Sequence, residues 1–382
     1  MNRAYKVLPV FAGDVSGACS ALYELGGMVV LHDPSGCNST YNTHDEVRWN
    51  KMESLIFISG LTDMDAITGN DEKLINDIVK AADELKPKFI ALANSPIPYV
   101  NGTDFEYIAR EVTKRCNIKT FAVFTNAFHD YTRGAGNAYL AVVNNLLEKK
   151  DRVKSEKIKV NLLGVTPLDF PRESDVKELT DFCKDNDFDL VANWSYFTSL
   201  EDILNSPKAD VNIVVSSTGY LAAKRMEELF NIPYVVGMPT GGFKKVLADD
   251  VKEVYKSGES KVSYLHVGCT SNEENDKEAM QNDNPAETQS KRFVIGESVM
   301  AGSVAAAKRI SEGKEYRAVI TTEIYDGLKR DIDILCVGEE EVENVIKDCE
   351  YAWGDPMYKH LCSDSVTFEE VPHFALSGRV YM

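Results

Sequence analysis

The sequence predicts an α/β protein whose chain forms three successive domains, each with a mainly parallel sheet, around a central cleft. Short apolar runs alternate with amphipathic stretches along most of the chain, as in repeated strand–helix units. This alternation restarts after about Lys157 and again after Ser290. The 382 residues are also too many for one hydrophobic core, so two or three domains are expected.

The clearest strand–helix unit lies between Asp71 and Asn94. Its first part places six apolar residues on one face of a predicted helix. Lys86-Pro87 is expected to end this helix, and residues 89–94 (FIALAN) are expected to follow as a buried strand. The glycine-rich stretch 131–139 lacks the Lys-Ser/Thr pair of a phosphate-binding loop, so we interpret it as a closely packed helix start. Further strands are expected at residues 159–165, 211–217, 234–238, 292–297 and 333–338.

These elements predict the domain boundaries. The charged stretch EKKDRVKSEK at 148–157 separates the first two blocks, and the segment 271–290 has almost no apolar residues, which is typical of a linker or exposed loop. We therefore expect an N-terminal α/β domain at 1–150, a second at 151–268, a polar linker or loop at 269–290, and a third α/β domain at 291–382.

Composition excludes several classes of partner. A net charge of −18 without a basic patch argues against binding to nucleic acid or to an anionic membrane surface. No run approaches the roughly 20 apolar residues that span a bilayer. The N-terminal residues do not have the pattern of a secretory signal, so a cytoplasmic location is expected.

Eight cysteines occur and none forms a CxxC pair, which argues against zinc ribbons and thioredoxin-like motifs. Disulfides are not expected in a reducing compartment. Four of the cysteines are expected in the core, whereas Cys269 and Cys362 lie in polar loops where a redox or ligand role stays open. The four are Cys116, Cys183, Cys336 and Cys349.

Cys19 and Cys37 differ from the others in their surroundings. Gly13 and Gly17 precede Cys19, and a Pro-Ser-Gly turn precedes Cys37. Glycines let backbone amides approach a sulfur closely, as the sulfides of a bound cluster require. From the residues alone, two small buried thiols at turns are an equally good interpretation.

Three motifs in this region occur in a fixed order. A Gly-Cys segment is followed by a His-x-x-x-Gly-Cys segment and then by an aspartate with Gly-x-x-x-Lys-Leu. They are Gly17-Ala18-Cys19, then His32 to Gly36-Cys37, then Asp65, Gly69 and Lys73-Leu74. The stretch from Cys19 to about Gly136 thereby resembles the nitrogenase component 1 type oxidoreductases, whose members include protochlorophyllide and nickel-sirohydrochlorin reductases.

The resemblance implies three Rossmann-like domains and a [4Fe–4S] cluster bound through Cys19 and Cys37. Family members usually supply a third cysteine where this chain has Ser95. Two thiols fall short of four cluster ligands. The resemblance therefore implies a cluster shared between subunits of a homodimer, or of a heterodimer with a related subunit. Asp33 is an alternative ligand, because related reductases use one aspartate.

The resemblance also implies a function. His373 matches a family histidine that faces the substrate pocket, and a structural histidine is the alternative. Residues 214–224 lack the cysteine that holds the nitrogenase cofactor, so nitrogen fixation is not expected. The chain is expected to take low-potential electrons from an ATP-dependent iron–sulfur reductase and to reduce a small molecule or tetrapyrrole.

Two other functions compete with this one. The first is a scaffold or carrier for metallocluster assembly without substrate turnover. The second is a metal-free binding protein in which Cys19 and Cys37 only pack. His32 and His44 flank Cys37, where they would donate hydrogen bonds to the cluster ligands, contact a docking partner or only shape the turn.

Overall fold

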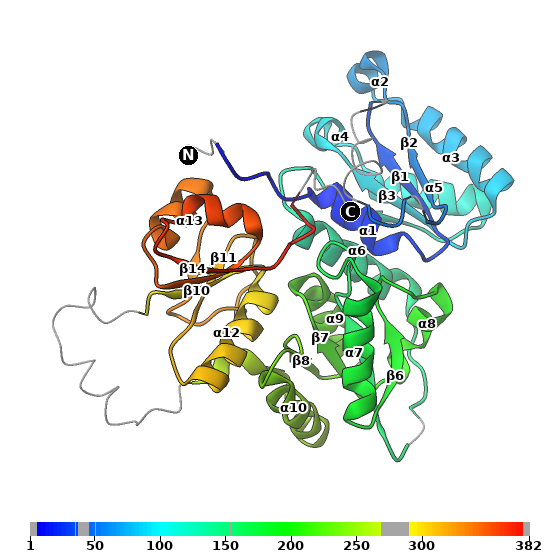
Figure 1. Cartoon of the computed structure of the whole chain (residues 1–382). Coiled ribbons are helices and arrows are strands. Elements are labelled where there is room, and N and C mark those ends of the chain that lie inside the picture. The colour runs from blue at the N-terminus through cyan, green and yellow to red at the C-terminus, as the bar shows by residue number, and fades with distance from the viewer. Residues whose placement is uncertain are drawn as a thin grey trace. The chain divides into compact units, whose positions relative to one another are not determined.

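A computed structural model describes residues 6–34, 36, 46–49, 51–152, 155–268 and 290–376. It is a mixed α/β structure with three parallel sheets, which confirms the predicted fold class (Figure 1). Cys37, His44, Cys269 and most of the polar segment 271–290 lie outside the described residues. No helix of the described ranges is long and apolar enough to cross a membrane.

The contacts divide the chain into two compact units. The larger unit comprises 10–212, 218–234 and 374–382, and the smaller unit comprises 1–9, 213–217 and 235–373. The three sheets follow one another along the sequence, within residues 28–123, 158–262 and 292–370. The domain boundaries at 150, 268 and 290 stay a prediction.

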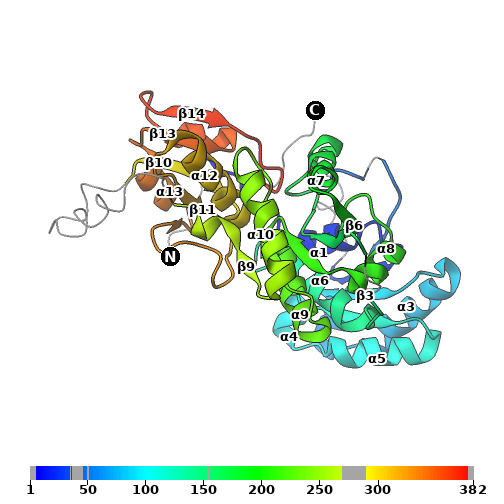
Figure 2. The same cartoon turned by 90° about the horizontal axis from the view of Figure 1, so that it is seen from below.

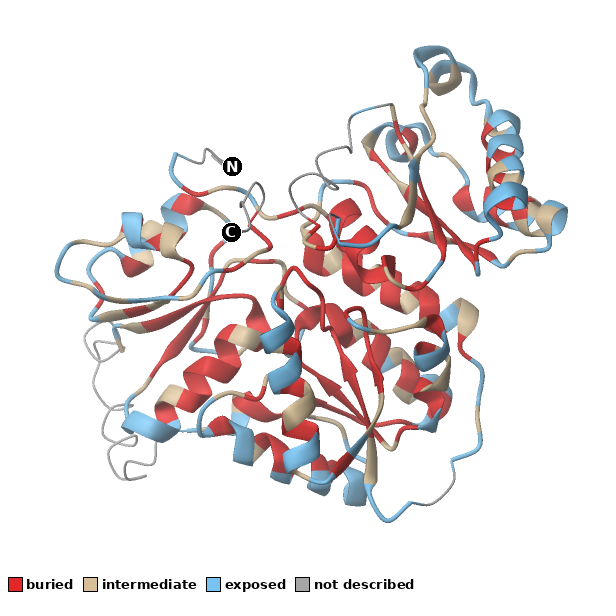
Figure 3. Cartoon of the chain, turned by 45° about the vertical axis from the view of Figure 1, so that its right-hand side comes forward, coloured by how far each residue is buried: buried red, intermediate tan, exposed pale blue. Residues whose placement is uncertain are grey.

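The first sheet has the strand order β2-β1-β3-β4. Side chains alternate between its faces, so β1 and β3 each bury residues on both sides (Figure 3). One face packs on α3 and α5 through an apolar cluster that includes Val30, Ile78, Leu92 and Ile108. The strands are β1 (Met28–His32), β2 (Leu55–Ile58), β3 (Ile90–Asn94) and β4 (Thr120–Val123).

Side-chain caps and left-handed residues mark the ends of several helices of this region. The predicted helix at 71–85 is α3: the Asn70 side chain caps it, and Lys86 ends it in a left-handed conformation with φ 48° immediately before Pro87. The helices are α1 (Asp14–Leu22), α2 (Asp63–Thr68), α3 (Asp71–Leu85), α4 (Pro96–Asn101), α5 (Phe105–Cys116) and α6 (Tyr131–Leu146).

The second sheet has the order β6-β5-β7-β8-β9. Its strands are β5 (Ile158–Leu163), β6 (Phe188–Asn193), β7 (Val211–Val214), β8 (Tyr234–Val236) and β9 (Lys261–Val262). Its helices are α7 (Glu173–Asp185), α8 (Leu200–Asn205), α9 (Tyr220–Phe230) and α10 (Phe243–Ser257), with 3-10 turns η2 (Ser206–Lys208), η3 (Ser217–Gly219) and η4 (Ser263–His266). Each helix follows a strand, as a parallel sheet requires.

The third sheet has the order β12-β11-β10-β13-β14. Its central strand β10 leads into α12, whose first turn is capped by the carboxylate of Glu297. Figure 2 shows α10 alongside α12. The elements are β10 (Arg292–Gly296), α12 (Ser298–Glu312), β11 (Arg317–Ile320), β12 (Ile334–Leu335), α13 (Glu339–Ile346), β13 (Tyr351–Gly354), η5 (Pro356–Leu361) and β14 (Thr367–Glu370).

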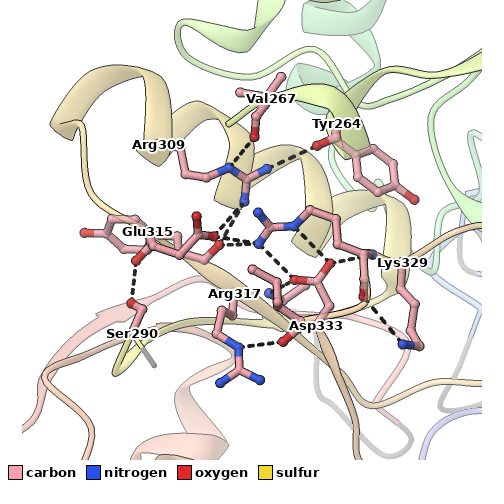
Figure 4. A network of polar contacts seen from close by, with 12 residues as sticks. Tyr264, Val267, Ser290, Arg309, Glu315, Arg317, Lys329 and Asp333 are labelled. Carbon is pink, nitrogen blue, oxygen red and sulfur yellow. Dashed lines mark hydrogen bonds and ion pairs between the residues drawn. The ribbon is translucent and has the colours of Figure 1, made fainter. Parts of the chain in front are cut away.

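A buried polar network fixes the loops beside this sheet (Figure 4). Arg309 donates to the carbonyl oxygens of Tyr264 at 3.1 Å and Val267 at 2.8 Å. Arg330 bridges the carboxylates of Glu315 at 2.8 Å and Asp333 at 3.1 Å. Arg309 and Asp333 are the buried members of this network and Arg330 and Glu315 are half-buried, and their contacts join the loops to the sheet.

Candidate functional site

The helix that carries Cys19 is held by a close crossing with α6. All nine residues of α1 are buried. A Cβ atom on Gly17 would lie 2.2 Å from the Tyr131 carbonyl oxygen, and one on Gly134 would lie 1.8 Å from the Asp14 carbonyl oxygen. The two helix backbones therefore meet at glycines, and the expected packing role of the 131–139 stretch is what the structure has.

The first turn of α1 is fixed by Asp14. Its carboxylate accepts hydrogen bonds from the backbone amides of Asn126 and Ala127, both at 2.8 Å. Its own amide donates to the His129 carbonyl oxygen at 3.0 Å. Burial raises the pKa of Asp14, although these backbone donors act to lower it. The start of the helix is thereby tied to the loop that follows β4.

Cys19 lies fully buried on this helix. Burial, and after it the negative charge of Glu46, raise the pKa of the Cys19 thiol far above its ordinary value. The thiol is therefore protonated at neutral pH, and a metal would have to displace that proton. Among the described residues no group of three or more His, Cys, Asp or Glu side chains could hold a metal ion.

A buried arginine anchors the chain that returns from the Cys37 segment. The Arg48 guanidinium donates to the Ser20 carbonyl oxygen at 2.8 Å and to the Ser195 carbonyl oxygen at 3.0 Å. It also pairs with the carboxylates of Glu24 at 3.0 Å and Glu46 at 2.6 Å. The residues after the undescribed stretch 37–45 are therefore fixed next to Cys19, because Ser20 follows it directly.

The Arg48 side chain is also enclosed by aromatic rings. Its guanidinium lies 4.6 Å from the ring centroid of Tyr23 and 5.4 Å from that of Tyr196. Cation–π contacts of this kind gain strength where water is excluded. Arg48 is not among the residues predicted from the sequence, where its only signal is a Glu-x-Arg pair shortly after the motif of Cys37.

Polar residues at the carboxyl edge of the first sheet fix the chain before Cys37. The Ser95 hydroxyl donates to the His32 carbonyl oxygen at 2.7 Å. His32 Nδ1 lies 2.8 Å from Ser59 Oγ, and the Asp33 amide donates to the same hydroxyl at 3.2 Å. Burial lowers the pKa of His32 to about 4, so its imidazole is neutral at pH 7. Ser95, in place of the usual third cysteine, thus supports the segment that leads to Cys37.

The aspartate–glycine–lysine motif forms the turn between α2 and α3. Lys73 Nζ lies 2.8 Å from Asp65 Oδ2, and Asn70 Nδ2 lies 3.1 Å from Asp65 Oδ1. Gly69 adopts the left-handed φ of 70° that ends α2. The motif lines a polar cavity of about 480 Å³. The cavity's polar and charged lining residues are His32, Ser59, Asp65, Thr68, Asn70, Asp71, Lys73, Asp77, Asn101, Thr103 and Asp104.

His373 belongs to the smaller unit and is buried. Its backbone amide donates to the Asp355 carboxylate at 2.7 Å, and Asp355 directly follows β13. The structure thus fixes the backbone of His373 at the carboxyl edge of the third sheet. Its role at a substrate pocket stays a prediction.

Three features belong to the N-terminal part of the chain. They are the buried helix α1 that carries Cys19, residues 46–49 held by Arg48, and the end of strand β1 at His32. Residues 14–246 match the sequence profile of the family described as Nitrogenase component 1 type Oxidoreductase. The chain belongs to this family. The match begins at Asp14, the first residue of α1, and covers the first sheet and strands β5 to β8 of the second sheet, ending in the first turn of α10.

Individual relatives agree with the family. The chain is 29% identical over 217 residues to the nitrogenase iron-molybdenum cofactor biosynthesis protein NifE of Clostridium pasteurianum, covering 54% of this chain and 45% of the relative. It is 24% identical over 221 residues to one of the subunits of the light-independent protochlorophyllide reductase of Crocosphaera subtropica, covering 56% and 43%. The chain thus spans less than half the length of these relatives.

A solved structure extends the likeness to almost the whole chain. The structure titled nitrogenase Cp1 at pH 6.5 superposes with a TM-score of 0.67 at 16% identity, over 97% of this chain and 87% of the other. At this identity the likeness concerns the fold alone. It includes the third sheet, which lies beyond the residues that match the family profile.

Proposed function

We propose that this protein is a nitrogenase-like reductase component. It takes low-potential electrons from an ATP-dependent iron–sulfur reductase through a [4Fe–4S] cluster and reduces a small molecule or tetrapyrrole. The observation that carries the proposal is the hydrogen bond from Arg48, which follows the Cys37 motif in the sequence, to the carbonyl oxygen of Ser20, the neighbour of Cys19. Family membership and the protochlorophyllide reductase relatives support the reductase activity.

The donor chemistry fits a cluster that two chains share. Thiolates are the usual ligands of an iron–sulfur cluster, and Cys19 and Cys37 are the two in family motif positions. Ser95 is engaged with the His32 carbonyl oxygen, so it holds backbone and supplies no third ligand. We infer that the same two cysteines of a second copy, or of a related subunit, complete four ligands.

The surroundings of Cys19 suit a bound cluster. When bound, the cluster would carry electrons singly between donor and substrate. Burial of α1 excludes water from the site. The carboxylates of Glu46 and Glu24 add negative charge, which disfavours an added electron and so would lower the reduction potential of a bound cluster. Arg48 neutralises part of that charge while it positions the chain.

A second candidate function is assembly of a metallocluster without turnover. The relative with 29% identity is a cofactor biosynthesis protein, which favours this alternative. Ser216, Ser217 and Thr218 are buried where the nitrogenase cofactor cysteine is expected, so neither function involves nitrogen fixation.

The test begins with anaerobically purified protein and three variants, Cys19→Ala, Cys37→Ala and Cys183→Ala. Cys183 is a buried cysteine of α7 outside the motifs and serves as the matched control. We expect iron and the absorbance near 400 nm to be lost in the first two variants and retained in the third. Equal iron in the wild type and Cys37→Ala would contradict the cluster assignment.

Turnover distinguishes the two candidate functions. The reduced cluster is mixed with candidate tetrapyrroles in the presence of the reductase and ATP. Cluster reoxidation with appearance of reduced product, dependent on both, supports catalysis. Transfer of intact iron–sulfur cluster to an apo-acceptor protein without substrate reduction supports the assembly function instead.

A further inference from the structure

Two cysteines outside the family motifs lie at the amino ends of neighbouring strands. Cys349 is in the short connection between α13 and β13, and Cys362 is in the connection between η5 and β14. The two strands pair in parallel, with Tyr351 opposite Thr367. The Ser363 amide donates to the Lys347 carbonyl oxygen at 2.8 Å, which joins the two connections directly.

The thiols of these two cysteines meet in one apolar cluster. Cys349 is a buried member of the cluster, and the half-buried Cys362 packs against it. Each thiol shifts the pKa of the other, and Cys362 Sγ lies 3.7 Å from the Tyr358 carbonyl oxygen. The Ser363–Lys347 hydrogen bond and the shared apolar cluster therefore bring the two side chains together.

We propose that Cys349 and Cys362 are an oxidisable dithiol that closes reversibly into an intramolecular disulfide. The oxidant is a peroxide. The Cys362 thiolate attacks one peroxide oxygen, which breaks the O–O bond, releases water and leaves a sulfenic acid. The Cys349 sulfur then attacks the Cys362 sulfur and displaces a second water. Two thiols and one hydrogen peroxide thus give one disulfide and two waters.

The surroundings assign different roles to the two sulfurs. The hydrogen bond from the Cys349 thiol lowers the pKa of Cys362, although burial opposes this effect. The same contact, together with burial, raises the pKa of Cys349. Cys362 is also the more accessible of the two. It is therefore the attacking thiol, and Cys349 resolves the sulfenic acid.

Cys336 provides an internal comparison. It is buried in the same apolar cluster, and burial raises the pKa of its thiol to about 11. Unlike Cys349 and Cys362, its pKa is shifted by burial and by Glu341 and not by another thiol. The proposal thus predicts oxidation of one pair among the three cysteines of this cluster.

The chain offers a direct readout. Trypsin cleaves after Lys347 and Lys359, which places the two cysteines on separate peptides. The full-length protein is treated with hydrogen peroxide, its remaining thiols are alkylated, and the digest is examined by mass spectrometry. We expect a linked pair of peptides, 2 Da lighter than their sum, that separates after treatment with dithiothreitol.

Variants complete the test. Cys336→Ser is expected to retain the linked peptides, whereas Cys362→Ser and Cys349→Ser lose them. In Cys349→Ser, Cys362 is expected to accumulate as sulfenic acid, trapped with dimedone, so a folded protein still gives a signal. Independent alkylation of both thiols after peroxide treatment, or linkage of Cys362 to another cysteine, would overturn the proposal.

Discussion

The proton on Cys19 links metal binding to pH. Burial and Glu46 raise the pKa of this thiol, so it stays protonated above about pH 8.5, where an ordinary cysteine has ionised. Ferrous ion must displace this proton. We therefore expect iron affinity to keep rising between about pH 8.5 and pH 9.5, by about tenfold per pH unit for each proton released.

Titration of the metal-free protein with ferrous ion against a competing chelator measures this dependence. In Cys19→Ser the rise above about pH 8.5 is expected to be smaller than in the wild type, because the variant has no proton on Cys19 to release. The same pH dependence in the wild type and the variant would show that Cys19 does not bind the metal.

Arg48 governs the stability of the same region. Replacing it by methionine leaves the buried carboxylates of Glu24 and Glu46 without their cation. We expect Arg48→Met to lower the free energy of unfolding by about 3–5 kcal/mol. The control is Arg115→Met, which removes the more exposed ion pair with Glu72 and should cost less than about 1 kcal/mol.

Urea unfolding monitored by circular dichroism compares these two variants with the wild type. Iron content is measured in parallel, because a displaced 37–48 segment should also release the cluster. A stable Arg48→Met variant with full iron content would show that the anchor is unimportant for the site.

At the scale of secondary-structure elements, the crossing of α1 and α6 depends on glycine. A methyl group on Gly17 would overlap the Tyr131 backbone, which cannot move as a side chain can. We expect Gly17→Ala to destabilise the protein by about 2–3 kcal/mol through this overlap. Gly13 precedes the same helix, and a methyl group there would find its nearest atom at 4.0 Å.

Gly13→Ala is thus the matched control, with an expected cost below about 1 kcal/mol. Thermal unfolding of both variants, with iron analysis, measures the difference. The same loss of stability in both variants would show that the overlap at the crossing does not determine the cost of Gly17→Ala, because alanine by itself favours the helix more than glycine does.

At the scale of the whole molecule, a shared cluster makes association depend on metal. Each chain carries a net charge of −18, so two copies repel one another unless specific contacts join them. We expect the iron-loaded protein to be a dimer and the chelated protein to dissociate, because metal–ligand bonds across an interface stabilise association.

Size-exclusion chromatography with light scattering, at micromolar concentration and fixed ionic strength, tests this expectation. Cys19→Ala is expected to elute as a monomer with or without iron in the buffer. A wild-type monomer that retains its iron would contradict the shared ligand set and leave the cluster itself in place. This outcome would favour two further cluster ligands within the same chain.

The sequence by itself determined the local elements and the family. Periodicity and capping predicted α3 between Asp71 and the Lys86-Pro87 stop, and the three motifs predicted the family that the profile match supports. Helix periodicity, helix caps and motif spacing involve residues that are close in the sequence, so they can be recognised without the structure. The strand predicted at 333–338 is shorter, at Ile334–Leu335, because apolar residues do not set where strand pairing ends.

Tertiary structure alone decided which distant residues meet. Arg48 and Ser195 lie 147 residues apart in the sequence and are joined by a hydrogen bond in the folded chain. Nothing in a local pattern specifies such contacts, because they arise when separate strand–helix units pack. Likewise, Gly17 suggested from the sequence that the backbone approaches a cluster closely. In the folded chain the Tyr131 backbone packs against this glycine. Residue types set the available chemistry, and packing selects the atoms that share a site.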